Sequence, residues 1–314
     1  MKPPVLCLSQ ILSRFLGIFC LILIILPAAA DNGAPVIVIN ADFQNTSVEN
    51  LGTSATVFGQ EKLEQREAQQ LQDILNLTPN VNFAGGSSRA RYFQIRGIGE
   101  RAQFVEPVNF SVGVIVDGID LTGISGAATL FDIQQVEVLR GPQGTLYGAN
   151  ALAGLINVVS NKPQNYTESG IEMTIGDYNS SNLNGYVSGP LNDSAGYRVA
   201  FQRSRSDGYI ENDYLNRQDT NNIDEGSFRV RFDWQLYDQL KFDLVLLRAD
   251  IDNGYDSFSL DNTRSTLSDE PGYDRQQTDA LAFNTSWLME NGNELKILLS
   301  HADSGVQYGY DEDW

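Results

Sequence analysis

Residues 131–163 read FDIQQVEVLRGPQGTLYGANALAGLINVVSNKP. Val136 and Val138 lie on one face of a predicted strand, because successive side chains of a strand point to opposite faces. Residues 140–142, Arg-Gly-Pro, form a turn, and residues 155–159 return as a second strand. The connection between the strands contains four glycines, and Gly144, Gly148 and Gly154 among them allow close approach of the backbone. This stretch therefore predicts two strands joined by a glycine-rich loop.

The region around this stretch, residues 31–164, predicts a small α+β body. Residues 60–77 show a helical pattern, and Pro79 ends it. The apolar positions that share one face of this helix are Leu63, Ala68, Leu71, Ile74 and Leu75. Short β-rich runs separated by glycine turns lie around the helix, at residues 54–58, 92–96, 112–116, 135–139 and 155–160.

From residue 166 onward the chain alternates with period two, which predicts about seven strands with one apolar and one polar face. The clearest apolar series is Phe228, Val230, Phe232, Trp234 and Leu236, and its polar alternates are Arg229, Arg231, Asp233 and Gln235. Short connections at residues 191–195, 237–239 and 290–293 contrast with long polar ones at 207–224 and 252–278. Strands joined in this way are typical of an outer-membrane β-barrel.

A secreted β-sandwich also alternates and is the competing fold. In a sandwich Arg229 and Arg231 face the core, whereas in a barrel they face a wet lumen. The arginine pair therefore favours the barrel.

The N-terminus predicts export. Lys2 and Arg14 precede an apolar run at residues 15–26, and three alanines follow at 28–30. This is the pattern of a secretory signal peptide, predicted here as residues 1–30. The run is short for a membrane-spanning helix, which needs about 20 residues, but a retained anchor remains an alternative.

Composition excludes several classes of function. The formal net charge of −19 argues against a nucleic-acid partner. Cys7 and Cys20 both lie in the predicted signal peptide, and His301 is the only histidine. Thiolate catalysis, thiolate metal sites and multi-histidine sites are therefore excluded in the mature chain. We expect no catalytic residue, no metal site, no cofactor and no enzyme activity, although a carboxylate-only hydrolase remains open.

Two further patterns resemble ligand sites but depart from them, and an adventitious cation at the second remains an alternative to a solvated acidic loop. Residues 97–102 match a dinucleotide-binding pattern, but the helix that such a fold needs is missing, since Pro107 follows closely. Three aspartates suggest calcium, but Gly254 occupies a position where a calcium loop needs a ligand; the three are Asp250, Asp252 and Asp256.

Four motifs together resemble the plug domain of the TonB-dependent outer-membrane receptors. They are Leu-Gln-Asp-Ile-Leu at 71–75 before Pro-Asn-Val at 79–81, Ile-Arg-Gly-Ile-Gly at 95–99, Val-Asp-Gly at 116–118, and residues 131–163. The strands that follow resemble the beginning of that family's 22-stranded barrel. The expected fold is thus an α+β plug domain at 51–164, followed by antiparallel barrel strands at 165–314. Because about seven strands cannot enclose a plug, we expect an N-terminal part of a longer receptor, which alone makes no pore.

The resemblance implies roles for particular residues. An N-terminal segment at 31–50 is expected to pair with TonB by adding a strand; an ordinary plug strand is the alternative. Its β-prone part is Pro35, Val36, Ile37, Val38, Ile39, Asn40 and Ala41. Arg96 and Arg140 match plug arginines that lock against barrel glutamates, which are expected on later strands. Gly59 stands at a helix cap.

The implied function is active uptake across the outer membrane of a Gram-negative bacterium. The implied partners are TonB with its inner-membrane energising complex, outer-membrane lipid, and a small ligand such as a ferric siderophore. Loops 84–91, 100–108 and 121–127 are expected at the apex, where the ligand-contact candidates are Ser87, Ser88, Arg89, Arg91, Gln103 and Phe104. Arg89 and Arg91 suit an anionic ligand, or are simply solvated.

Other cargoes and one other class remain open. Within the same family the ligand could be a cobalamin, haem or an oligosaccharide. A secreted β-rich adhesin or carbohydrate-binding protein is the alternative from a different class. Dependence on detergent distinguishes the two classes, because a lipid-facing stripe at Phe228, Phe232 and Trp234 needs an amphiphile.

Overall fold

The structure is a computed structural model of the chain. It describes residues 38–41, 47, 50, 52–85, 88–101, 107–144, 150–259 and 261–312. Of the predicted functional residues, those that lie outside this range are Pro35, Val36, Ile37, Ser87, Gln103 and Phe104. The predicted signal peptide lies outside it as well. Residues from Ile37 onward form one compact unit.

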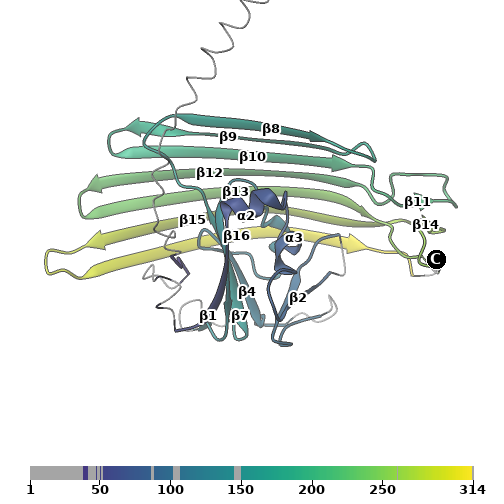
Figure 1. Cartoon of the computed structure of the whole chain (residues 1–314), viewed down its shortest axis with the longest axis horizontal. Helices are drawn as coiled ribbons and strands as arrows, with labels where there is room; N and C mark the ends of the chain where they lie inside the picture. Colours follow the sequence, from purple (N-terminus) through teal and green to yellow (C-terminus); the bar gives the residue numbers. More distant parts are fainter. Residues whose placement is uncertain are drawn as a thin grey trace, which may run out of the picture. The chain divides into compact units, whose positions relative to one another are not determined.

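A five-stranded sheet organises the N-terminal part of this unit (Figure 1). Its order is β1 (Ser54–Gly59), β6 (Ile133–Arg140), β7 (Gly154–Ser160), β4 (Val112–Val116) and β5 (Ile119–Asp120). The strand pair predicted from residues 131–163 is confirmed: β6 and β7 are antiparallel, with Val138 opposite Ile156. Strand β4 joins β7 in parallel. This sheet and the short elements around it, within residues 38–164, are called the N-terminal body below.

The prediction of one continuous helix at residues 60–77 is wrong. The structure contains α2 (Gln60–Gln65) and α3 (Gln72–Leu75) instead. Glu67 between them has a φ of 49°, which a helix cannot continue through. Asp73 then accepts the backbone N–H groups of residues 69 and 70, both at 2.9 Å, and so satisfies donors at the start of α3. The predicted apolar face is nevertheless buried at Leu63, Leu71, Ile74 and Leu75.

Three further elements complete the N-terminal body. Strands β2 (Val81–Ala84) and β3 (Tyr92–Ile95) form a separate antiparallel pair. A short 3-10 helix, η2, covers Ser125–Ala127.

The predicted set of about seven alternating strands is confirmed as a seven-stranded sheet in which all neighbours are antiparallel. In spatial order it contains β16 (Glu294–Gly309), β15 (Gly272–Leu288), β13 (Leu240–Tyr255), β12 (Ile223–Tyr237), β10 (Ala195–Ser206), β9 (Ser181–Asn192) and β8 (Glu168–Ile175). The first and last of these are its edges. Two short strands in the long connections, β11 (Glu211–Asn212) and β14 (Ser265–Thr266), pair in parallel and were not predicted.

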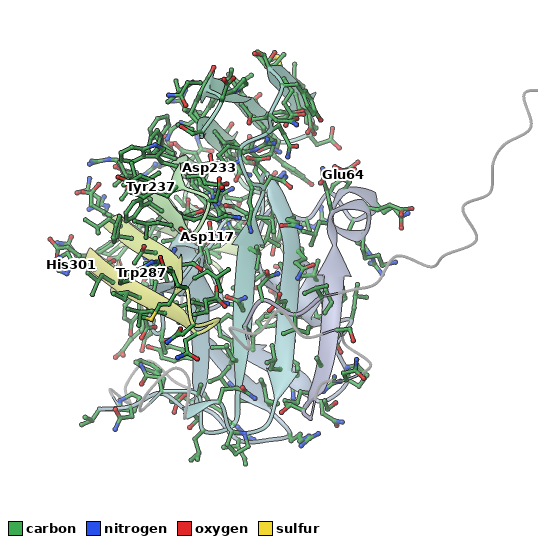
Figure 2. All side chains as sticks on the ribbon, turned by 90° about the vertical axis from the view of Figure 1, so that its left-hand side faces the viewer. Glu64, Asp117, Asp233, Tyr237, Trp287 and His301 are labelled. Atoms are coloured by element: carbon green, nitrogen blue, oxygen red, sulfur yellow. The ribbon has the colours of Figure 1, made fainter. Side chains whose placement is uncertain are left out.

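The seven-stranded sheet has one covered and one uncovered face. Val245 and Ala282 are fully buried beneath the N-terminal body, whereas Phe228 is 46% exposed on the opposite face. Large apolar side chains that remain exposed on that outer face include Ile171, Met173, Ile175, Trp234, Leu246, Leu281, Ile297 and Leu299. Figure 2 shows Trp287 and His301 on the side of the sheet away from the N-terminal body. No helix in the described part of the chain is long and apolar enough to span a membrane.

The five-stranded sheet is covered on both faces. One face contributes Val136, Val138 and Ile156 to a large core that also contains Val245 and Ala282 of the seven-stranded sheet. The other face forms a small separate cluster in which Ile39, Ala41, Ile115, Leu139, Ala151 and Leu155 meet. Ile39 and Ala41 therefore pack on the face opposite the one that contributes to the large core.

A substitution at Gly154 tests how tightly β6 and β7 pack against each other. A Cβ atom added there would overlap the backbone oxygen of Leu139 and the side chain of Ile95. We expect Gly154→Ala to lower the free energy of unfolding by about 1–3 kcal/mol, the usual cost of overpacking. The matched control is Gly52→Ala, where nothing lies within 4 Å of the new atom. Urea unfolding in detergent measures both, and equal stabilities of the two variants would contradict the tight packing.

Candidate functional site

The candidate site is the interface between the N-terminal body and the covered face of the seven-stranded sheet. The charged side chains of this interface, with their polar neighbours, form two groups at different heights along the strands. The long-loop belt lies near the long connections and consists of Gln70, Ser88, Arg89, Arg91, Glu225, Asn253 and Asp274. The short-turn belt lies nearer the tight turns and consists of Asp117, Asp132, Ser160, Arg198, Arg229 and Arg231.

Asp274 is the first acceptor of the long-loop belt. This residue of β15 is 0% exposed. Its Oδ2 accepts the backbone N–H of Ser88 at 2.9 Å and the Ser88 hydroxyl at 2.7 Å. Its Oδ1 pairs with the guanidinium of Arg91, which is also buried. One carboxylate of the sheet thus holds both ends of the 88–91 loop.

Glu225 of β12 is the second acceptor of this belt. Its Oε1 accepts Arg89 Nε at 2.6 Å and Asn253 Nδ2 at 2.7 Å, and its Oε2 accepts Gln70 Nε2 at 3.0 Å. Asn253 Nδ2 also lies 2.8 Å from the Ser88 hydroxyl. The two carboxylates are therefore joined into one network, which raises the cost of removing any member.

The predicted apex loop at 121–127 also reaches the sheet. Gln276 Nε2 of β15 donates to the carbonyl oxygen of Ile124 at 2.8 Å. A Cβ atom on Gly126 would lie 2.7 Å from Gln276 Oε1, so glycine permits this close approach. Ser125 donates to the carbonyl of Ala90 at 3.2 Å, which ties this loop to the 88–91 loop.

In the short-turn belt the arginines come from the sheet. Arg198 of β10 makes a bidentate contact with Asp132, with distances of 2.7 Å and 2.6 Å, and donates to Glu168 of β8 at 2.6 Å. Its guanidinium also lies 4.5 Å from the ring centre of Tyr186. Planar, two-point pairing of this kind suits arginine and fixes orientation.

Two arginines of β12 complete the short-turn belt. Arg231 Nη1 contacts Asp117 Oδ1 at 3.2 Å and the Ser160 hydroxyl at 3.1 Å, and its Nε donates to Asp243 at 2.8 Å. Arg229 donates to the carbonyl oxygen of Phe131 at 2.6 Å. Figure 2 shows Asp117 between the strands of the N-terminal body and the seven-stranded sheet.

These contacts correct one sequence prediction. Arg229 and Arg231 point to the inner face of the sheet, as the alternation predicts, but they do not face water there. Each is 7% exposed, because the N-terminal body covers it. Four backbone and hydroxyl oxygens of that body accept hydrogen bonds from the two arginines in place of water: the carbonyl oxygens of Phe131, Asp132 and Ser160, and the Ser160 hydroxyl.

The predicted locking arginines lie elsewhere. Arg140 donates to the hydroxyl of Ser54 at 2.9 Å, inside the N-terminal body, and Arg96 is exposed. Within the described residues neither shows a hydrogen bond or ion pair to the seven-stranded sheet. Their locking role stays a prediction. The arginines of the N-terminal body that pair with carboxylates of the sheet are instead Arg89 and Arg91.

Three of the ligand-contact candidates already bind carboxylates of the seven-stranded sheet. Ser88, Arg89 and Arg91 lie together at the long-loop belt, and the alternative of solvated arginines is wrong, because the side chains of Arg89 and Arg91 are 13% and 7% exposed. Contact with a ligand stays a prediction for these residues. The acidic partners Glu225 and Asp274 were not predicted. The sequence signal that could have found them is a carboxylate near the start of a strand, at a position whose side chain points to the covered face of the sheet.

The long connections beyond this belt are fastened to each other. Asn212 Nδ2 donates to buried Asp256 at 2.8 Å, and Thr266 donates to the same carboxylate oxygen at 2.9 Å. Nearby, the hydrogen bond from Arg217 holds the pKa of Asp219 below its usual value. In the described part of the chain, no group of His, Cys, Asp or Glu side chains is arranged to hold a metal ion.

A polar cavity separates α2 from the first strands of the sheet. Its volume is about 650 Å³, and Arg198 and Glu168 line it together with Asn184 and Gln202. The side-chain oxygens of these two amides are buried and have no hydrogen-bond partner among the residues that the structure describes. The interface is therefore tight at the two belts and hollow beside α2.

Comparison with known proteins identifies the N-terminal body. Residues 47–155 match the TonB-dependent Receptor Plug Domain. The chain carries a TonB-dependent receptor plug domain. The matched residues include both short helices, β1, β4, β5, β6, the start of β7 and the 88–91 loop. The N-terminal body therefore contains the plug domain and is called the plug below, and the two belts are contacts between it and the seven-stranded sheet.

Relatives extend this similarity beyond the plug. The chain is 29% identical over 197 residues to the pesticin receptor of Yersinia pestis, which covers 60% of this chain and 29% of that receptor. It is 30% identical over 168 residues to the vitamin B12 transporter BtuB of Vibrio vulnificus, covering 51% of this chain and 26% of the transporter. The chain thus spans less than a third of the length of these relatives.

Solved structures share the fold. The ferric yersiniabactin uptake receptor FyuA from Yersinia pestis matches 83% of this chain and 42% of its own, with 22% identity and a TM-score of 0.71. The alcaligin receptor FauA from Bordetella pertussis matches 90% of this chain and 44% of its own, with 12% identity and a TM-score of 0.66. A plug domain followed by antiparallel strands is therefore the fold of this chain, as the sequence predicts.

The buried belts predict a large difference between two arginine pairs. Arg198 and its partner Asp132 are 6% and 3% exposed, whereas Arg248 and its partner Asp279 are 58% and 66% exposed. We expect Arg198→Met to cost about 3–5 kcal/mol, because it leaves buried carboxylate without its cation. Arg248→Met should cost roughly 0–1 kcal/mol. Denaturant unfolding in detergent measures both, and similar costs would contradict the locking role of Arg198.

Proposed function

We propose that the chain forms part of a receptor for active uptake of a scarce small ligand across the outer membrane of a Gram-negative bacterium. One observation carries the proposal: a plug domain lies on the polar face of an antiparallel sheet whose opposite face exposes apolar side chains. That arrangement suits strands with lipid on one side and a stopper on the other. No covalent chemistry is required.

A ferric siderophore is the proposed cargo. Similar proteins whose names refer to iron support it, among them the iron-regulated outer membrane virulence protein of Vibrio cholerae and the solved ferric yersiniabactin uptake receptor. Cobalamin is the second candidate, because a vitamin B12 transporter is similarly related. Either ligand would enter from the long-loop end, where Ser88, Arg89 and Arg91 meet Glu225 and Asp274.

Binding at that end has a direct physical route to the plug. An anionic ligand that contacts Arg91 competes with Asp274 for the same guanidinium donors. Weakening this pair also loosens the 88–91 loop, since Asp274 accepts two hydrogen bonds from Ser88. Occupancy of the site would thus change how firmly the plug is held.

The proposed energy source is TonB with its inner-membrane complex. The segment that would pair with TonB is residues 35–41, as the sequence predicts, through strand addition. The adhesin alternative is less consistent with the structure, because a water-soluble sandwich covers the apolar face that is exposed here at Phe228 and Leu299.

Uptake by cells tests the proposal. The full-length gene is expressed in a host that lacks its own siderophore receptors, and radioactive iron is supplied as ferric siderophores of several chemical classes. We expect uptake of at least one class, and its loss when residues 35–41 are deleted, while binding of that siderophore to the cell surface persists. A proton uncoupler should also stop uptake.

A parallel assay with labelled cobalamin assigns the cargo. Uptake of cobalamin alone would replace the siderophore proposal and keep the transport mechanism. Protein that is present in the outer membrane but binds neither ligand at the cell surface would contradict both cargoes. Uptake that survives deletion of residues 35–41 would contradict the role of that segment.

A further inference from the structure

Residues 38–41 are held on the plug by one buried carboxylate. Glu137, in the middle of β6, is 0% exposed. Its Oε1 accepts the backbone N–H of Asn40 at 2.8 Å and Asn40 Nδ2 at 3.1 Å. Its Oε2 accepts the backbone N–H of Ala41 at 3.0 Å. The chain near the N-terminus thus closes over this side chain.

The remaining contacts of Glu137 come from neighbouring amides. Gln135 Nε2 donates to Oε1 at 2.6 Å, and Asn157 Nδ2 donates to Oε2 at 3.0 Å. Gln135 Nε2 also lies 2.8 Å from the carbonyl oxygen of Val38. All of these donors are uncharged. Because a buried carboxylate is costly unless it is hydrogen-bonded, Glu137 depends on the donors that the 38–41 segment supplies.

The apolar part of this contact is small and separate from the main core. Ile39 and Ala41 are fully buried, and they pack with Leu139 and Leu155 in the small cluster on one face of the five-stranded sheet. The main core lies on the opposite face and contains neither residue. Residues 38–41 can therefore leave the plug without opening its main core.

We propose that Glu137 is an internal binding site for residues 38–41, and that it competes with a strand-adding partner for their backbone. Strand addition needs free backbone N–H groups. The N–H groups of Asn40 and Ala41 are given to Glu137 while the segment is docked. Docking on Glu137 and full pairing of these residues with a partner strand exclude each other. Only the identity of that partner, TonB, rests on the proposed function.

Hydrogen exchange in the full-length protein, purified in detergent without TonB or ligand, tests the binding site. Glu137→Gln replaces one acceptor oxygen by an NH₂ group that faces donors. We expect exchange in the peptide that covers residues 38–41 to become roughly 10- to 100-fold faster, as loss of a charge-assisted hydrogen bond predicts. Amides of β7 report on the plug core and should stay protected. Glu61→Gln removes an exposed carboxylate of α2 and is the matched control.

A second variant acts from the segment and leaves β6 intact. Asn40→Asp places a second carboxylate against Glu137, and repulsion between like charges should release the segment to a similar extent. If Glu137→Gln also speeds exchange of the β7 amides, the plug core of that variant is disturbed, and Asn40→Asp alone tests the proposal. Unchanged exchange of residues 38–41 in Asn40→Asp, with β7 protected, overturns the proposal.

Affinity for the purified periplasmic domain of TonB tests the competition. Asn40→Asp should bind it more tightly, because less of the protein is held in the docked state. Faster exchange without tighter binding would support the internal site and overturn the competition. Neither measurement involves cargo, so a failed uptake assay leaves both results interpretable.

Discussion

Pairing of buried charge is the constraint on which the arrangement of plug and sheet depends. Asp274, Arg91, Arg198 and Asp132 are all nearly inaccessible to water, and each has its partner on the other body. A buried ion pair adds little net stability, but loss of one member leaves an uncompensated charge that costs several kcal/mol. The buried charges therefore determine where the plug sits on the sheet, and they contribute little to the strength of the contact between plug and sheet.

The two belts have opposite polarity, and this selects a direction. At the long loops the plug supplies arginines and the sheet supplies carboxylates, as in the Arg89–Glu225 pair. At the short turns the sheet supplies arginines and the plug supplies carboxylates, as in the Asp117–Arg231 pair. A plug turned end for end would place like charges opposite each other. Because the apolar core between the belts is not directional, the charges are what define the orientation.

How much of this could be predicted from the sequence depends on how local each signal is. Strand periodicity and the 131–163 motif predict the two sheets, since both signals lie within a few residues. The break at Glu67 is missed because the apolar spacing of the helix continues across it. The pairing of Arg89 with Glu225 spans 136 positions, and no local pattern predicts it. Glu137 reads as an ordinary polar alternate of a strand, since its contacts with Asn40 are 97 positions away.

Strand β6 connects the binding site of residues 38–41 to the core that the plug shares with the seven-stranded sheet. Its Val136 and Val138 face the core shared with the seven-stranded sheet, while Glu137 faces residues 38–41. Hydrogen-bond ladders on both sides, to β1 and to β7, hold this strand. A force applied at Asn40 therefore meets a few side-chain hydrogen bonds and a small apolar cluster before it meets two ladders. Because the weaker set must yield first, the segment can detach while the plug remains folded on the sheet, and only greater tension would reach the charged belts.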